Sequence, residues 1–341
     1  MIEPIASRVR EIVRSGGCDA APGEVADLLS DLQRVQGLRV APVEGAPEEL
    51  NPVPEAAFKL MTIAHFGPSE ARLVFRTSGT TTGSPGRHLV LDPDLARDAA
   101  LRGFERFVLY GCAPKRCLSL VPPFDERPTS SLSFMISAVL ETFGVRGRAC
   151  VRRGKDLDLA GAGQAFRDAI DAGEPLVLLG TSLDFLTLFD ALAEPVRLPA
   201  GSRAMHTGGA KASGRAVDRA ALRAAFVDRL GIEADDVVEE FGMTELTSQS
   251  YDAPRVSQGP RRFVSVPWMR SRVVDPRTLD EVEDGRRGLL LHEDLANCWT
   301  AAALLSSDLA TRVGDGFADV VRAPGAPARG CSSEASTGTT R

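Results

Sequence analysis

The stretch "FRTSGTTTGSPGRHLVLD", residues 75–92, decides how the fold is interpreted. Eight of the nine residues from Thr77 to Pro85 are Thr, Ser or Gly. An apolar run, "ARLVF" (71–75), precedes them, and an alternating run, "RHLVLD" (87–92), follows. This pattern predicts two strands joined by a loop rich in hydroxyl groups and glycine.

Two interpretations of this loop remain open on composition alone. Gly, Ser and Thr are common in ordinary turns between strands. They also suit an anion site, because glycine lets the backbone approach a phosphate and successive N–H groups then point at one anion. Hydroxyl donors would come from Thr77, Ser78, Thr80, Thr81 and Thr82. The loop lacks the Lys of the Walker pattern and does not match the three spaced glycines of dinucleotide sites.

The composition is that of an ordinary globular protein. The 341 residues are 43% hydrophobic and 25% charged, with a net charge of -6. This charge disfavours binding to nucleic acid or to an anionic membrane. No apolar run approaches the length of a membrane helix. The start, "MIEPIASRVREIVRSGG" (1–17), has an amphipathic helical pattern of mixed charge rather than that of a signal peptide, so we expect a cytoplasmic protein.

The cysteines do not form a recognisable metal or disulfide pattern. None of the six stands in a Cys-x-x-Cys pair, and the four His are not at zinc-finger spacing. We expect most of them to be reduced thiols. The chain has only four lysines, and none follows Lys211.

Strand-like and helix-like segments alternate through most of the chain, which predicts an α/β fold with a largely covered sheet. After about residue 260 the pattern becomes β-rich, and the tail from Ser332 is rich in Ser, Thr and Gly. The strands are predicted at 71–75, 87–92, 116–123 and 175–180, and the helices at 92–111, 131–144, 182–194 and 214–231.

Three further stretches stand out. "MHTGGAK" (205–211) is typical of a turn between a strand and a helix. "EEFGMTELTSQ" (239–249) places a hydroxyl, Thr244, beside a carboxylate, Glu245. These oxygens suit Mg²⁺ shared with a nucleotide phosphate, although an exposed helix start would look the same. In "SSDLATRVGDGFADVVRAPGAPARGCS" (306–332), acidic residues and glycine-rich turns surround apolar pairs.

Taken in this order, the four stretches resemble the adenylate-forming superfamily of acyl-CoA synthetases, luciferases and peptide-synthetase adenylation domains. Finer details resemble its acyl-protein synthetase (LuxE-like) branch, and the likeness runs from about Pro52 to Ser332. These details are "PVPEAAFK" (52–59), "GRH" (86–88), "FGMTELTSQSYD" (241–252), "DLAN" (294–297), "GDGF" (314–317), "RAPGA" (322–326) and "RGCS" (329–332).

The resemblance implies an α/β fold like the large N-terminal domain of these enzymes, with sheets covered by helices and a β-rich C-terminal segment. The small mobile C-terminal domain of the superfamily would be lacking. The expected division is a helical segment at 1–51, the large domain at 52–322 and a short tail at 323–341.

The resemblance also implies roles for individual residues. Thr244 would touch the α-phosphate of ATP, Glu245 would bind Mg²⁺, and Asp308 would hold the ribose hydroxyls. Arg322 falls where an Arg precedes the hinge of the superfamily. The loop residues that would embrace the phosphates are Thr77, Ser78, Gly79, Thr80 and Thr81, and those lining the pocket for adenine and the acyl group are Gly208, Gly209 and Ala210.

The implied chemistry is attack of a carboxylate on the α-phosphate, followed by transfer of the acyl group to a thiol. ATP and Mg²⁺ would be required, and coenzyme A is a further candidate. The partners would be a small-molecule carboxylic acid and an acyl-accepting carrier or reductase protein, with no nucleic acid and no membrane. Catalysis would rest on positioning and charge neutralisation.

Several departures leave rival functions open. Thr82 replaces the usual Gly of the loop, "SSD" replaces Thr-Gly-Asp, and the sequence ends 19 residues after Arg322, without the catalytic lysine of the superfamily. The chain could therefore be a synthetase, an acyltransferase that uses acyl-CoA or acyl-AMP, or a silent partner subunit.

Cys331 has two interpretations. It is either a stray thiol near the terminus or, as the "RGCS" resemblance implies, the thiol that carries the acyl group to a partner reductase. Arg329 would favour its thiolate, the nucleophilic form of the side chain. Cys298 is the alternative acyl-carrying thiol.

Overall fold

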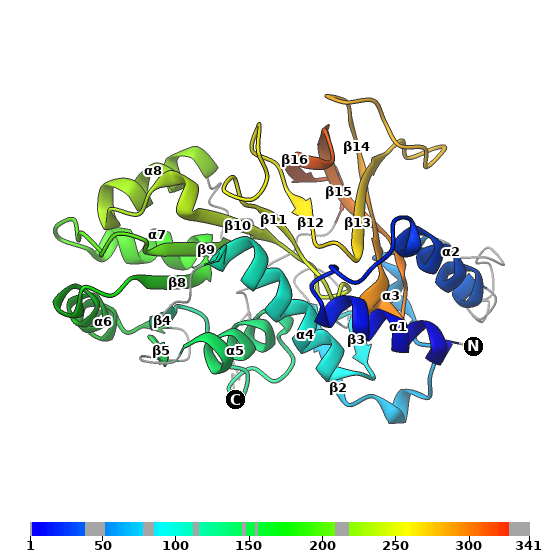
Figure 1. Cartoon of the computed structure of the whole chain (residues 1–341), viewed down its shortest axis with the longest axis horizontal. Coiled ribbons are helices and arrows are strands. Elements are labelled where there is room, and N and C mark those ends of the chain that lie inside the picture. The colour runs from blue at the N-terminus through cyan, green and yellow to red at the C-terminus, as the bar shows by residue number, and fades with distance from the viewer. Residues whose placement is uncertain are drawn as a thin grey trace, which may run out of the picture.

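The computed structural model describes residues 2–37, 52–77, 85–111, 116–144, 148–153, 156–208 and 218–326. Two main sheets with packed helices make up a mixed α/β fold, as the sequence predicts (Figure 1). Within the described ranges, no helix combines the length and the apolar character that crossing a membrane would need.

The larger sheet has seven strands in the order β12-β11-β10-β9-β8-β4-β5. The five strands from β10 to β5 run parallel, and β11 and β12 are antiparallel additions at one edge. The strands are β4 (Arg116–Ser119), β5 (Arg148–Cys150), β8 (Leu176–Thr181), β9 (Arg203–Thr207), β10 (Val237–Phe241), β11 (Ser250–Asp252) and β12 (Val264–Ser265).

Helices cover both faces of this sheet. Val177 and Leu179 of β8 belong to the core beneath α4 (Pro93–Phe104) and α5 (Ser131–Phe143). Leu176 and Leu178, which point the other way, belong to a second core. That core lies beneath α6 (Leu159–Ala172), α7 (Ser182–Ala191) and α8 (Arg219–Leu230). Burial on both faces explains why β8 reads as a continuous apolar run.

The smaller sheet has the order β1-β15-β14-β13, with β16 paired to β15. β1 lies parallel to β15, so residues 53–54 lie beside residues 304–305. Two further pairs, β2 with β3 and β6 with β7, stand apart from the main sheets. These strands are β1 (Val53–Pro54), β2 (Leu73–Arg76), β3 (Arg87–Val90), β6 (Arg152–Arg153), β7 (Asp156–Leu157), β13 (Met269–Val274), β14 (Arg287–Asp294), β15 (Ala303–Val313) and β16 (Gly316–Arg322).

Local signals set the helix ends. Asp92 caps α4 by accepting from the N–H of Leu95 at 3.0 Å, and Ser130 caps α5 through the N–H of Ser133 at 3.1 Å. α8 stops at Gly231, whose φ of 68° is left-handed. Within the described ranges, the remaining helical segments are α3 (Ala57–Leu60), a π-helical turn (Glu105–Leu109) and 3₁₀ turns at Pro68–Glu70, Ala234–Asp236 and Leu295–Asn297.

The N-terminal helices α1 (Ile2–Arg14) and α2 (Glu24–Gly37) pack into the same core as α4 and α5. From α2, the buried Gln36 donates to the carbonyls of Asn297 and Cys298 at 3.2 and 3.0 Å. Its Oε1 accepts from the N–H of Ala302 at 2.8 Å. Residues before 52 thus fix a loop more than 260 positions away. The predicted division at residues 51/52 and 322/323 remains a prediction.

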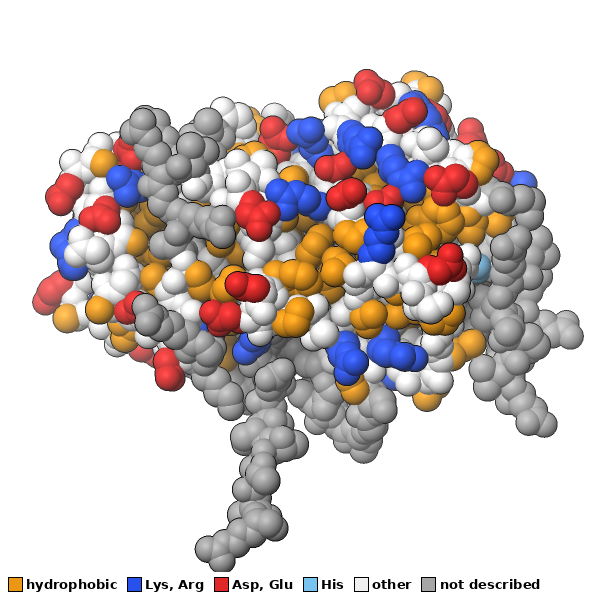
Figure 2. Space-filling model, turned by 90° about the horizontal axis from the view of Figure 1, so that it is seen from below, with side chains coloured by type: hydrophobic (Ala, Val, Ile, Leu, Met, Phe, Trp, Pro, Cys, Tyr) orange, Lys and Arg blue, Asp and Glu red, His pale blue; other side chains and the backbone are white. Residues whose placement is uncertain are grey.

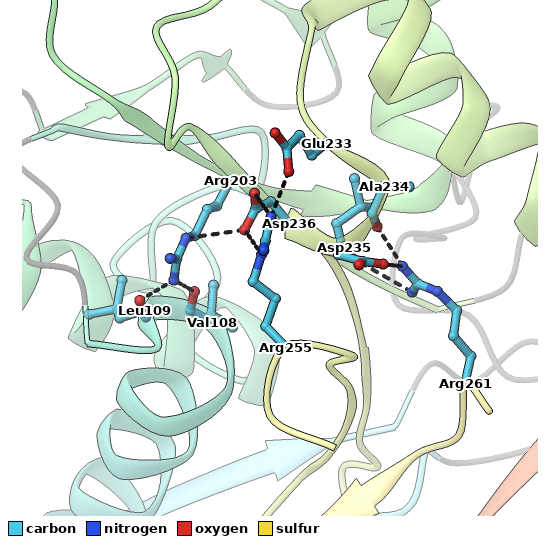
Figure 3. A network of polar contacts seen from close by, with 10 residues as sticks. Val108, Leu109, Arg203, Glu233, Ala234, Asp235, Asp236, Arg255 and Arg261 are labelled. Carbon is cyan, nitrogen blue, oxygen red and sulfur yellow. Dashed lines mark hydrogen bonds and ion pairs between the residues drawn. The ribbon is translucent and has the colours of Figure 1, made fainter. Parts of the chain in front are cut away.

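An ion-pair network secures the amino ends of β9 and β10 (Figure 3). Arg255 binds the Asp236 carboxylate with both Nε and Nη2 at 2.8 Å, and its Nη2 reaches Glu233 at 2.7 Å. Arg203 lies 3.6 Å from Asp236 and donates to the carbonyl of Val108 at 2.8 Å. Open α/β sheets bind ligands at the carboxyl ends of their strands. This network holds the opposite edge of the sheet, at the amino ends.

Charged side chains of both signs are interspersed on the face drawn in Figure 2, with exposed hydrophobic side chains between them. Among the described residues of this face, no broad field of one sign develops. Proteins that bind nucleic acid chiefly through phosphates carry such a field.

Replacing Gln36 tests whether α2 supports the 297–302 loop. Gln36→Leu removes three hydrogen bonds and leaves the Ala302 N–H buried without a partner, so the free energy of unfolding should fall by about 1–3 kcal/mol. Urea unfolding measures this, with Gln258→Leu as the control because Gln258 is exposed. Equal midpoints for the two variants would contradict the assigned role.

Candidate functional site

Strands β2 and β3 pair as an antiparallel hairpin, and along the chain the hydroxyl-rich segment connects them. At its neck, the N–H of Thr77 donates to the carbonyl of Gly86 at 3.0 Å, and the N–H of Gly86 donates to Thr77 Oγ1 at 2.8 Å. A Cβ on Gly86 would lie 3.2 Å from the Cγ of Lys59. The predicted phosphate-binding residues Ser78, Gly79, Thr80 and Thr81 lie outside the described residues, and the described neck at Gly86 lies beside Lys59.

The "GMTEL" turn follows β10 and leads into β11. It is tied to the hairpin by His88 of β3, whose Nδ1 is 2.7 Å from the Thr244 carbonyl. His88 Nε2 is 3.3 Å from Thr300 Oγ1. Burial lowers the pKa of His88 to about 4, so the ring is neutral near pH 7 and serves as a positioning group.

Asp294 and Asn297 of the "DLAN" motif hold the far side of this turn. The Asp294 carboxylate accepts from the N–H of Ser248 at 2.8 Å, from its hydroxyl at 2.8 Å and from the N–H of Thr247 at 3.2 Å. Asn297 accepts from the N–H of Thr247 at 3.0 Å and donates to the Glu245 carbonyl at 2.9 Å. Two buried side chains therefore fix the backbone of the turn.

The Glu245 side chain is only 4% exposed. Burial raises the pKa of its carboxyl to about 7, and the charge of Asp308 acts in the same direction. Lys59 and Arg322 act in the opposite direction. The site therefore contains a carboxylate whose negative charge is not fully compensated by the protein.

Asp308 and Arg322 meet across the β15–β16 pair, where they are directly opposite each other. Arg322 Nη1 lies 3.1 Å from the Asp308 carboxylate, and its Nη2 lies 2.5 Å from Glu55 Oε1. A second bond of 3.2 Å joins Arg322 to Glu55 Oε2. Arg322 thus bridges two carboxylates and fixes the position of Asp308.

A second buried carboxylate lies at the carboxyl end of β10. Glu240 is hydrogen-bonded by the Thr207 side chain of β9, and burial raises the pKa of Glu240 to about 7. Gly208 follows Thr207 with a φ of 75°, a conformation that favours glycine. The predicted pocket residues Gly209 and Ala210 lie outside the described residues.

The structure brings together three residues that the sequence placed at one site: Glu245, Asp308 and Arg322. Thr77 lies at the loop neck, Thr244 and Gly208 lie at neighbouring strand ends, and Cys331 lies outside the described residues. Sequence reasoning assigned no role to Glu55, Lys59, His88, Asp294 or Asn297. The charged residues of "PVPEAAFK" and the Asp and Asn of "DLAN" were the available signals.

The family model described as "Acyl-protein synthetase, LuxE" matches residues 162–331. Over these residues the chain is similar to the LuxE acyl-protein synthetase family. No curated protein matches the chain. The matched LuxE segment includes β10, the "GMTEL" turn, Asp308 and Arg322.

Solved structures extend the likeness to the whole fold. An open 2-hydroxyisobutyryl-CoA ligase with 2-HIB-AMP and CoA has a TM-score of 0.58 and 15% identity, over 90% of this chain and 69% of its own. ATP-bound MatB from Rhodopseudomonas palustris has a TM-score of 0.55 and 17% identity, over 76% and 49%. MenE from Bacillus subtilis has a TM-score of 0.53 and 14% identity, over 74% and 49%.

These similarities establish the fold of adenylate-forming enzymes, which confirms the predicted fold class. The chain spans about half the length of MatB and MenE, with 49% of each covered.

The residues around Glu245 suit a magnesium ion held jointly with phosphate. Mg²⁺ sites of that kind use one or two carboxylates, the remaining ligands being phosphate oxygens and water. Among the described residues, no three His, Cys, Asp or Glu side chains form a metal cluster. Glu245, a buried carboxylate with a raised pKa, fits a cation that arrives with a nucleotide.

The raised pKa of Glu245 predicts a pH-dependent stability. Because the folded-state pKa of about 7 exceeds the ordinary 4.5, the folded form retains the proton longer. Ionisation of Glu245 therefore lowers stability progressively from about pH 4.5 to about pH 7. Glu245→Gln, neutral at every pH, should raise the free energy of unfolding at pH 8 by up to about 3 kcal/mol.

The gain should shrink towards zero near pH 4.5, and thermal or urea unfolding at the two pH values measures it. Glu283→Gln is the matched control because Glu283 is exposed. A gain from Glu245→Gln that is the same at both pH values would contradict the account.

Proposed function

We propose that the chain activates a carboxylic acid with ATP as an acyl-adenylate and then transfers the acyl group to a thiol. The supporting observation is the convergence of Glu245, Asp308 and Arg322 with Lys59 at the neck of the hydroxyl-rich loop. Each residue comes from a different segment, and all lie on a fold whose solved relatives include ATP-bound and acyl-AMP-bound enzymes.

In the first half-reaction, a carboxylate oxygen attacks the α-phosphorus, the bond to the bridging oxygen breaks and pyrophosphate leaves. Ser78, Gly79, Thr80 and Thr81 would hold the departing phosphates through N–H and hydroxyl donors. Thr244 would donate to the α-phosphate. Glu245 would hold a magnesium ion, whose chemical contribution when bound would be charge neutralisation on the phosphates.

The nucleoside would be held by the β15–β16 pair and by the turn after β9. Asp308, oriented by its hydrogen bond with Arg322, would accept from the ribose hydroxyls. Gly208, Gly209 and Ala210 would line the space shared by adenine and the acyl group.

Lys59 is the cation that we assign to the phosphates. It is the only lysine among the described residues, and its side chain is exposed. The aliphatic part of this side chain lies beside Gly86 at the loop neck. Its charge reaches Glu245. It would contribute there part of the positive charge that a catalytic lysine supplies in the superfamily.

In the second half-reaction, a thiolate attacks the carbonyl carbon and AMP leaves with the bridging oxygen. Burial raises the pKa of Cys117 to about 12 and also raises that of Cys298, so neither suits a nucleophile. Cys150, half-buried, also has a raised pKa because of burial. These properties disfavour the three buried or half-buried thiols, whereas Cys18 is exposed. The "RGCS" resemblance favours Cys331, or an external thiol of a carrier protein, a reductase or coenzyme A, as the acceptor.

Two substitutions test the site through acid-dependent exchange of pyrophosphate into ATP. Glu245→Gln should lower the rate by about a hundredfold or more, because it removes a charge-stabilising group. Lys59→Met should raise the KM for ATP and lower kcat by about tenfold, with partial recovery in Lys59→Arg. Glu283→Gln is the control.

Near-normal exchange in Glu245→Gln would remove that residue from the mechanism. If the wild type exchanges nothing with any acid, yet moves acyl groups from acyl-AMP or acyl-CoA, the chain is an acyltransferase. If it does neither, it is a silent partner subunit.

Labelled acid with ATP, or labelled acyl-AMP, tests Cys331. We expect a hydroxylamine-sensitive label that disappears in Cys331→Ser and persists in Cys298→Ser and Cys150→Ser, since a thioester forms on the accessible thiol. Loss of the label in Cys298→Ser or Cys150→Ser alone would show that another thiol carries the group. No label in any form of the protein would mean direct transfer to an external thiol.

A further inference from the structure

The parallel sheet has a topological switch point between β4 and β8. The two strands are neighbours, but β4 is followed by α5 on one face and β8 by α7 on the other (Figure 1). The loops at the carboxyl ends of these two strands therefore diverge and leave a crevice. Open α/β sheets bind ligands in a crevice of this kind. A pocket lies there, lined by Val121 and Pro122 just after β4, by Thr181 at the end of β8 and by Asp184 in the first turn of α7.

The pocket also contains two arginines, Arg127 and Arg152. Arg152 forms an ion pair with the buried Asp184, so these two charges offset each other. Arg127 is half-buried, and its guanidinium forms no hydrogen bond or ion pair with any described residue. The acidic neighbours Asp125 and Glu126 are exposed and therefore screened by solvent. Among the residues that the structure describes, none pairs with the positive charge of Arg127 in this pocket.

A second observation points independently to a polar ligand. Ser133 lines the pocket and is 0% exposed, and its hydroxyl has no hydrogen-bond partner among the described residues. It lies in the first turn of the 13-residue helix α5, whose Ser130 cap satisfies the Ser133 N–H. A buried hydroxyl without a partner is unfavourable in the free protein. A ligand oxygen in this pocket would accept its hydrogen bond, beside the positive end of the helix dipole.

The pocket lies next to the site of the proposed reaction. The N–H of Arg76, one residue before the loop neck, donates to the Thr129 carbonyl at 2.9 Å, beside the start of α5. Thr181 of β8 lines the pocket, and it lies in one row with Thr207 of β9 and Glu240 of β10. Two strand spacings, about 10 Å, therefore separate the pocket from Glu240, near the end of β10 that leads into the "GMTEL" turn.

We infer that this pocket binds a second acidic group of the carboxylic acid substrate. The inference rests on the proposed function and names its substrate class: a diacid whose far acidic group meets Arg127 and Ser133 while the near carboxylate reacts. A plain alkyl chain would bury the Arg127 charge and the Ser133 hydroxyl without partners, which is unfavourable. The spacing favours several atoms between the two acidic groups.

Matched acids and one charge-removing variant test the inference on the full chain. The diacids are succinate, adipate and suberate, and the monoacids of equal length are butyrate, hexanoate and octanoate. Binding without ATP is measured by calorimetry, and kcat/KM by pyrophosphate exchange. The variants are Arg127→Met and Ser133→Ala, with Arg286→Met as the control because Arg286 is exposed away from the pocket.

We expect adipate or suberate to exceed its monoacid in kcat/KM by about tenfold or more, since removing one partner of a charge-assisted pair costs about this factor. Arg127→Met should remove this preference for the diacid in kcat/KM. Ser133→Ala should reduce the preference several-fold, and Arg286→Met should leave it unchanged. Ser133→Ala keeps the test valid if Arg127→Met fails to fold.

Preference for the monoacids, or a ratio unchanged in both pocket variants, would overturn the inference. Diacid binding that depends on Arg127, without exchange for any acid, would uphold the pocket and contradict the proposed reaction. Tighter Arg127-dependent binding of inorganic phosphate or phosphopantetheine than of any diacid would overturn the diacid assignment, because the pocket would then serve a phosphate.

Discussion

The site depends on the buried Asp294 carboxylate and on the turn that it holds. Asp294 accepts four hydrogen bonds, from Thr247, Ser248 and Ala296. Burial raises the pKa of Asp294 to about 6, while these donors act in the opposite direction. Its partner Asn297 fastens the Glu245 carbonyl to the same loop. These two buried side chains restrain the turn after β10 through contacts with residues 245, 247 and 248.

Other buried side chains hold this turn and its neighbouring loop in place. Gln36 of α2 fixes the loop that contains Asn297, and His88 of β3 fixes the carbonyl of Thr244. The Glu245 side chain can then remain buried at a cost in stability, because its backbone has no freedom to turn it towards solvent. Such a cost is common where a residue is positioned for function rather than for the stability of the fold. In the proposed reaction, a nucleotide-bound cation would relieve it.

Local sequence signals determined much of the architecture. The strand predicted at 175–180 corresponds to β8, and the helices predicted at 92–111 and 214–231 correspond to α4 with its π-helical turn and to α8. Those features follow from periodicity and capping, which involve residues a few positions apart. The order of motifs placed Glu245, Asp308 and Arg322 at one site, and the structure brings them together.

The supporting contacts could not be predicted in the same way. Glu55 and Arg322 are 267 positions apart, and Gln36 and Cys298 are 262 apart. No local pattern encodes such pairs. The charge at Arg127 is also significant only because the switch point of the sheet brings the ends of β4 and β8 together. Its sequence neighbours Asp125 and Glu126 would suggest an ordinary solvated loop.

The central claim is that a carboxylate oxygen of the substrate attacks the α-phosphorus of ATP. Incubating the chain with ATP, a thiol acceptor and an acid labelled with ¹⁸O in both carboxylate oxygens tests this directly, with AMP and pyrophosphate analysed by mass spectrometry. The account predicts one ¹⁸O atom in AMP for each acyl group transferred and none in pyrophosphate. Label in inorganic phosphate, as an acyl-phosphate route would give, or acyl transfer with unlabelled AMP, would contradict it.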